Sequence, residues 1–150
     1  MRNLTLNVKK KWFDMILSGD KKEEYRELKD FSVVRCLQMD SELVYDGCGN
    51  KYKKTELMNA YAFSKGLTGK RLGAVKYLLG ICASFKEYDT VTFLNGMKAL
   101  TPTIVIECKG IIIGGAVPEW SDNMQGEMFV IKLGKLISTK NINNNAPTYL

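Results

Sequence analysis

The sequence predicts an α+β domain in which a helix packs against a small β-barrel that is closed or nearly closed. Strand-like segments cluster toward the two ends of the chain, whereas the strongest helical periodicity lies in the middle, and this segregation favours α+β over a parallel α/β sheet. Several strand candidates are short and carry an internal glycine, as barrel strands do at corners. The 150 residues suffice for one domain, expected over 1–138 with a flexible tail over 139–150.

The N-terminal part should form a strand, a helix and a second strand. Residues 4–8 alternate between apolar and polar, the period-two pattern of a half-buried strand. An apolar stripe at helical spacing begins at Trp12, and Gly19 is well placed to end that helix because glycine adopts the left-handed conformation easily. Residues 21–28 are highly polar but contain no breaker, so we expect a short strand over a wet surface.

The middle of the chain should be largely helical. Short apolar runs within residues 32–45 predict a further strand region that ends at a glycine-rich turn. Beyond it, apolar residues at helical spacing predict helices over about 55–65 and about 70–86, the second with the stronger amphipathic pattern.

Three further strands should complete the barrel, over residues 90–94, 103–113 and 128–137. Gly110 and Gly134 lie inside the last two, where a glycine suggests a bend or a bulge. The pair Gly114-Gly115 lacks the sequence context of a phosphate-binding loop, and we expect a hairpin turn there.

The composition indicates a basic cytoplasmic protein without a metal ion or cofactor. The net charge of +6 favours polyanionic partners such as nucleic acid, although surplus lysine also serves solubility. The four cysteines are widely spaced and the chain has no histidine, so we expect reduced, structural thiols and no metal site. No apolar stretch is long enough to span a bilayer, and the N-terminus has no apolar signal core, so we expect no membrane association.

The densest charge cluster is the stretch SGDKKEEYRE directly after the first expected helix. In a strand, Lys22, Glu24 and Arg26 would share one face, while Lys21 and Tyr25 would lie on the other. Such alternation is often a solvated charge ladder that contributes little to stability. The same residues would also suit a polar cleft, and spacing alone leaves both interpretations open.

Two blocks of the chain resemble the activating-signal-cointegrator-homology (ASCH) family. The first is Met15-Ile16-Leu17-Ser18-Gly19-Asp20-Lys21 followed by Glu24-Tyr25-Arg26, which is similar to the family's opening pattern, G-x-K-x-x-E-x-R in this chain. The second follows in the expected order and comprises VTFLNG (91–96), VIECKGI (105–111), PEW (118–120) and FVIKLG (129–134). Together they cover about half of the chain. Residues 40–88 match neither block and resemble a family-specific, largely helical insertion.

The resemblance implies a PUA-like β-barrel with a polar cleft between barrel and helix, which would bind RNA or a nucleotide-like ligand. Arg26 would fork onto a phosphate or a base carbonyl, Lys21 would neutralise a phosphate, and Glu24 would accept from an exocyclic amine. Tyr25 lies in the same segment. Trp120 would either stack on a base or plug the barrel end. We expect Lys21 and Arg26 to point into the largest polar cleft.

Some ASCH relatives are amidohydrolases that act on an acylated nucleoside, with a lysine three residues before a threonine nucleophile. The lysine position is Lys21 here, but Glu24 stands where the threonine would be, and a carboxylate does not readily replace a hydroxyl nucleophile in amide hydrolysis. The sequence therefore favours binding over catalysis. Two alternatives remain: a hydrolase that acts on a modified nucleoside or RNA through these two residues, and a protein-interaction adaptor that docks through the helical middle segment.

Overall fold

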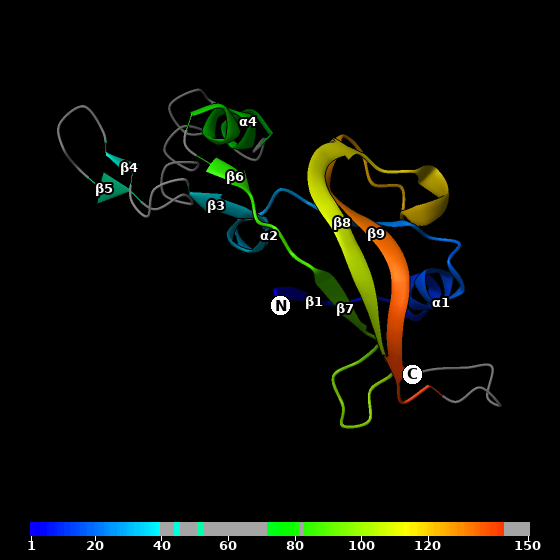
Figure 1. Ribbon diagram of the computed structural model, residues 1–150. Helices are drawn as coiled ribbons and strands as arrows, with labels where there is room; N and C mark the ends of the chain where they lie inside the picture. The colour runs from blue at the N-terminus through cyan, green and yellow to red at the C-terminus, as the bar shows by residue number, and fades with distance from the viewer. Residues whose placement is uncertain (40–43, 46–50, 53–71, 82, 143–150) are drawn as a thin grey trace.

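The computed structural model of the protein describes residues 1–39, 44–45, 51–52, 72–81 and 83–142. It confirms the α+β class: a five-stranded mixed sheet curls into a half-barrel, with helices beside it (Figure 1). The strand order is β1 (Asn3–Asn7), β7 (Thr90–Leu94), β8 (Thr103–Gly115), β9 (Glu127–Lys140) and β2 (Glu23–Arg26). The β1–β7 pair is parallel and the other neighbours are antiparallel, so β1 and β2 form the two edges.

Strand β1 and helix α1 (Lys10–Ser18) follow the expected patterns and contribute to the main core. Alternate residues of β1 are buried, and α1 buries Trp12, Phe13 and Ile16 in the same hydrophobic cluster as residues of β7, β8 and β9. Gly19 ends the helix with a φ of 87°, a left-handed conformation that glycine adopts without a steric penalty. The expected helix stop is thus confirmed.

Strands β8 and β9 form one long, curved hairpin whose pairing is irregular at the two glycines expected to bend it (Figure 1). Gly110 has a φ of 128°, and the register shifts beside it. A second shift leaves Gly134 and Lys135 opposite Glu107. A Cβ atom at Gly134 would lie 2.0 Å from the Glu107 Oε1 atom, so the glycine leaves room for that carboxylate. Both expected irregularities are confirmed.

The connection between β8 and β9 differs from the one that the sequence predicts. Gly114 and Gly115 do not form the hairpin turn but pair with the first residues of β9 as the end of β8. Residues 116–126 make the connection instead and contain the short 3-10 helix η1 (Pro118–Trp120). Glycine is compatible with an extended strand as well as with a turn, and here the pairing between β8 and β9 continues through both glycines.

The strand expected within residues 32–45 begins later than predicted, because a helix comes first. Helix α2 (Asp30–Cys36) buries Val33 and Cys36, three residues apart, while Val34 is exposed. Strand β3 (Leu37–Met39) follows directly. The β-branched pair Val33-Val34 suggested a strand, but the burial follows helical spacing.

The second helix expected in the middle of the chain is shorter than predicted. Helix α4 (Leu72–Ile81) gives way to strand β6 (Ala83–Phe85), which pairs with β3 in an antiparallel two-stranded sheet. Pairing between segments far apart in sequence overrides the local helical periodicity there.

The rest of the middle segment is described only in part. Strands β4 (Val44–Tyr45) and β5 (Lys51–Tyr52) form another two-stranded sheet. The helix expected over 55–65 lies outside the described residues, as does most of the expected tail, although β9 itself continues to Lys140. Among the described helices, none is long and apolar enough to cross a membrane.

Candidate functional site

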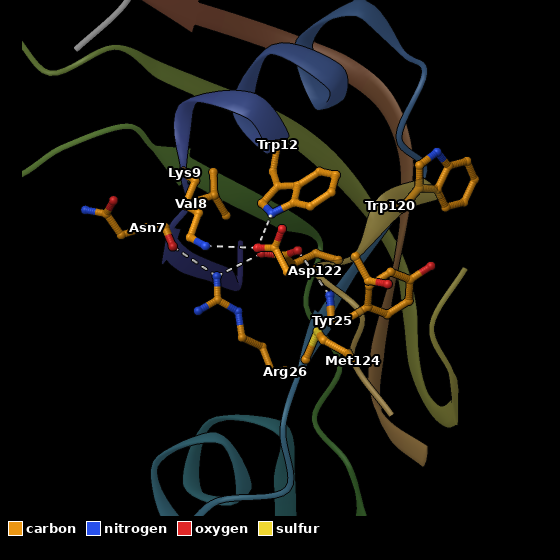
Figure 2. A pocket seen from close by; sticks show the side chains of 11 residues that line it. Asn7, Val8, Lys9, Trp12, Tyr25, Arg26, Trp120, Asp122 and Met124 are labelled. Carbon is orange, nitrogen blue, oxygen red and sulfur yellow. Dashed lines mark hydrogen bonds and ion pairs between the residues drawn. The ribbon is translucent and has the colours of Figure 1, made fainter. Parts of the chain in front are cut away.

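A pocket of about 200 Å³ lies between the start of α1, the end of β1, strand β2 and the 116–126 loop (Figure 2). We refer to it as the α1–β2 pocket. Four of the five residues predicted to bind a ligand line it, namely Glu24, Tyr25, Arg26 and Trp120, and the fifth, Lys21, lies directly behind its wall. Two other hollows in the described part of the molecule measure about 400 and 500 Å³, so the expectation of the largest cleft is wrong.

Lys21 is an internal cation whose side chain is only 1% exposed. Its Nζ donates to the Trp120 backbone oxygen (2.5 Å) and lies 3.3 Å from Glu24 Oε1. The same ammonium lies 4.8 Å from the ring centroids of both Trp12 and Tyr25. Burial lowers the pKa of Lys21 below its usual value, and the nearby Glu24 carboxylate opposes that shift. The wet surface expected here is therefore wrong, because the charge is enclosed by two rings and a carboxylate.

Glu24 joins Lys21 to Arg26, and the three form what we term the charged triad. Glu24 Oε2 accepts from Arg26 Nη2 at 2.9 Å, and Oε1 accepts from the Tyr25 backbone N–H at 3.1 Å. Arg26 Nη2 also donates to the Asn7 backbone oxygen (3.0 Å). Arg26 Nε is buried and has no hydrogen-bond partner within the described part of the chain. The face expected to be shared by Lys22, Glu24 and Arg26 is present for Glu24 and Arg26, and it is turned into the pocket. The expectation for the lysines is wrong: Lys22 is exposed, and Lys21 lies beside Glu24 instead, because both lysines precede β2.

Tyr25 ties β2 to the 116–126 loop. Its hydroxyl donates to Glu23 Oε1 (2.7 Å) and accepts from the Val117 backbone N–H (3.0 Å). Burial and the Glu23 carboxylate raise the pKa of Tyr25 well above its usual value, against the opposing effect of the Val117 N–H. Glu23 in turn forms an ion pair with Lys132 of β9. Both sides of the Tyr25 hydroxyl are therefore already engaged within the protein.

Trp120 is half-buried at the pocket and packs with Tyr25 and Met124 in a small hydrophobic cluster. Its backbone oxygen is the acceptor for Lys21, which fixes the loop against the triad. Trp120 is thus partly exposed, as stacking on a base requires, and partly packed, as plugging the barrel end requires.

Three further lining residues, Lys9, Trp12 and Asp122, are joined by polar contacts. Lys9 Nζ lies 2.9 Å from Asp122 Oδ2, and the indole Nε1 of Trp12 donates to the same oxygen at 3.4 Å (Figure 2). The hydrogen bond from Lys9 lowers the pKa of Asp122 below its usual value, and the bond from Trp12 adds to this. Helical spacing identifies Trp12 only as a core residue, and it is buried, yet its N–H faces the pocket. The available signals were the run of three lysines from Lys9 and the position of Asp122 just after Trp120.

A second hollow, of about 400 Å³, lies between the C-terminal end of α1 and the irregular part of the β8–β9 hairpin. We refer to it as the lysine hollow, because Lys22, Lys109 and Lys135 line it together with Glu107. All three lysines are exposed, and none forms an ion pair with another described residue. Lys21 also lines this hollow, so it separates the two cavities.

Neither the Ser121 hydroxyl nor the two described thiols are activated for nucleophilic attack. The Ser121 hydroxyl in its lining donates to the Val117 backbone oxygen. In the part of the chain that the structure describes, no cluster of three or more cysteine, aspartate or glutamate side chains could hold a metal ion. Cys36 and Cys108 are free, and burial raises the pKa of Cys108 and that of Cys36 to about 11, which makes both poor nucleophiles. The other two cysteines lie outside the described residues.

Comparison of the chain with known proteins found no matching family model, no matching curated protein and no matching solved structure.

Proposed function

We propose that this chain is an ASCH-type, PUA-like domain that binds RNA or a nucleotide-like ligand in the α1–β2 pocket. The observation that carries the proposal is the combination of residues in one small pocket: the half-buried Trp120 together with the guanidinium of Arg26 and the indole N–H of Trp12. A nucleobase offers a flat face that stacks on aromatic rings and an edge that pairs with fixed donors and acceptors. Stacking contributes about 1–3 kcal/mol per base.

The size and polarity of the pocket agree with a single base. Its volume of about 200 Å³ is below the roughly 300–1,000 Å³ of typical sites for drug-sized ligands. Arg26 Nε is buried without an acceptor in the described part of the chain, and a buried donor of this kind is costly unless something satisfies it. A base carbonyl or a phosphate oxygen would supply the acceptor in a charge-assisted hydrogen bond.

The lysine hollow supports RNA over a free nucleotide. A strand held by one base must pass its phosphates over neighbouring surface, and Lys22, Lys109 and Lys135 present unpaired ammonium groups among the described residues. Phosphate neutralisation by such groups supplies most sequence-independent affinity for nucleic acid. The net charge of +6 agrees with this assignment.

The curled sheet also supports the PUA-like assignment. The half-barrel and the α1–β2 pocket beside it support this part of the proposal, in which the sheet belongs to a PUA-like barrel.

The two alternatives have less support. A hydrolase would need Lys21 or Glu24 available for proton transfer, but both are buried and engaged with each other, and Lys21 also donates to Trp120. An adaptor would need an exposed apolar face on α4. Among the side chains of α4 that are described, Val75 is buried and Lys76 forms an ion pair with Glu127.

The proposal is tested by replacing Arg26 with alanine and measuring the fluorescence anisotropy of a labelled random RNA pool at several salt concentrations. We expect the variant to lose about 1–3 kcal/mol of binding free energy. For the wild-type protein, three or four engaged phosphates predict a log affinity against log salt slope of about −2 to −3. Arg26→Lys keeps the charge but loses the planar fork, and it should bind nearly as weakly.

The matched control is Arg2→Ala, which removes the same charge from an exposed side chain outside both cavities. It should change binding by less than about 0.5 kcal/mol. Absence of RNA binding at low salt, or equal losses for Arg2→Ala and Arg26→Ala, would contradict the proposed function.

A further inference from the structure

Asp122 places a negative charge inside the α1–β2 pocket at the point where two donors converge. A single oxygen, Oδ2, accepts from both Lys9 Nζ and Trp12 Nε1 (Figure 2). Lys9 comes from the start of α1 and Asp122 from the 116–126 loop, so the contact crosses the mouth of the pocket. The carboxylate therefore occupies a position that an anionic group of a ligand would also favour.

The two contacts that the Asp122 carboxylate makes, with Lys9 and with Trp12, are both weak. The Lys9 and Asp122 side chains are 78% and 51% exposed, and ion pairs between exposed groups contribute little. The Trp12 N–H reaches Oδ2 only at 3.4 Å, longer than the roughly 2.9–3.0 Å usual for such a bond. A buried indole thus directs its donor into the pocket without a well-placed acceptor among the described residues. Within the described chain, Ser121 is the last residue of this loop with a backbone–backbone hydrogen bond, and Asp122 follows it.

The charges around the pocket point to the kind of group that would replace Asp122. Lys9 and Arg26 are balanced in the lining by Glu24 and Asp122. Glu24 is committed to the buried triad, whereas Asp122 is not. If Asp122 moves aside, Lys9 and the Trp12 N–H are left without their acceptor and the lining becomes positive. An anion would restore the balance.

We propose that Asp122 is an internal competitor for the phosphate of the ligand. In the bound state a phosphate oxygen replaces Asp122 Oδ2 and accepts from Lys9 Nζ and Trp12 Nε1, while the base occupies the aromatic part of the pocket. Asp122 thus lowers the affinity for phosphate-bearing ligands and leaves the affinity for uncharged nucleosides unchanged. The choice of a nucleotide as the phosphate donor rests on the proposed function.

The test compares Asp122→Asn with wild type, because asparagine keeps the size of the side chain and removes its charge. We expect Asp122→Asn to bind the random RNA pool about threefold to fivefold more tightly, the range that an exposed ion pair can account for. Asp122→Ser, which is shorter, should show the same gain. Adding Lys9→Ala should abolish it in a double-mutant cycle.

Asp14→Asn is the matched control for net charge. Asp14 forms an ion pair with Lys10 on α1 and does not line the pocket, so its replacement adds the same positive charge elsewhere. It should leave RNA affinity unchanged. Circular dichroism melts should show that every variant is folded.

A second readout does not depend on RNA. The chain has two tryptophans, so the Trp12 indole N–H resonance is assigned by its persistence in Trp120→Phe. Titration with inorganic phosphate should shift this resonance in Asp122→Asn at about threefold to fivefold lower concentration than in wild type. If RNA binding is absent but phosphate shifts this resonance, the phosphate site stands and the RNA function fails. If Arg26-dependent RNA binding is found, but Asp122→Asn gives neither the affinity gain nor the phosphate shift, the competitor role is overturned.

Discussion

The two ends of helix α1 hold similar charges in opposite physical states. Beside its N-terminal half, the charged groups of Lys21, Glu24 and Arg26 meet; they are buried or partly buried, internally paired and covered by aromatic rings. At its C-terminal end, the lysines of the lysine hollow are exposed, and no ion pair joins them to another described residue. The contrast is sharpest between the neighbours Lys21 and Lys22, of which the first is buried and the second exposed.

This difference shows that the local direction of the chain, not the residue type, decides whether a lysine is buried or exposed here. After Gly19, the Lys21 backbone N–H donates to the Met15 oxygen, so the chain turns back on α1 before β2 begins at Glu23. Lys21 therefore precedes the strand and can reach Glu24, whereas Lys22 faces solvent. A buried charge must be paired to be tolerated, and an exposed charge remains available to an outside partner.

The largest effect should come from breaking the triad. Glu24→Gln leaves Lys21 and Arg26 without their shared counter-charge, and we expect the free energy of unfolding to fall by about 3 kcal/mol, as for other buried pairs that lose one partner. Chemical unfolding in urea measures this. Glu107→Gln in the lysine hollow is the matched control and should change stability by less than about 0.5 kcal/mol. Equal effects of the two substitutions would show that the two ends of α1 do not differ as described.

The sequence predicts the features that depend on local residue pattern, but not those that depend on contacts between residues far apart in the chain. The β1 strand, the Gly19 helix stop and the shared face of Glu24 and Arg26 follow from period and residue type. The burial of Lys21 does not, because its acceptor is the backbone of Trp120, 99 residues away. The role of Asp122 likewise depends on Lys9 and Trp12, which it meets across more than a hundred residues. Contacts of that kind leave no periodic signal.

The misplaced elements have a related cause. Helix α2 was obscured by the β-branched pair Val33-Val34, although burial of Val33 and Cys36 follows helical spacing. Strand β6 was hidden inside an apolar run that also fits a helix, and only its pairing with β3 decides the matter. A short apolar run fits either structure until its partner is known.

A smaller effect should appear in the pH dependence of stability. Because burial lowers the pKa of Lys21, the folded state releases this proton at a lower pH than the unfolded chain does. Between the lowered value and about 10.4 the unfolded chain binds more protons, so stability rises with pH. Lys21→Met removes that gain, and the stability difference between wild type and variant should therefore change in favour of wild type from about pH 8 to pH 10.

The control for this measurement is Lys22→Met, whose side chain is exposed. An exposed side chain carries no burial cost, so the change with pH should be smaller for Lys22→Met than for Lys21→Met. The comparison is best kept below about pH 10, because the raised pKa of Tyr25 makes stability fall with pH once unfolded tyrosine ionises. A difference for Lys21→Met that does not change with pH would mean that the folded and unfolded states hold this proton equally.

The smallest effect on the fold, and a distinct effect on binding, should come from the lysine hollow. Lys22→Ala and Lys135→Ala remove exposed ammonium groups, so each should leave the unfolding midpoint unchanged. If these groups contact RNA phosphates, each substitution should make the salt slope shallower by about 0.7 and weaken binding to every sequence alike. Lys98→Ala, an exposed loop lysine outside both cavities, gives the matched charge loss and should leave the slope as it is. A slope that shifts equally for all three would mean that only net charge attracts the RNA. A change in slope for Lys22→Ala and Lys135→Ala alone would indicate that the RNA runs from the α1–β2 pocket along the C-terminal end of α1.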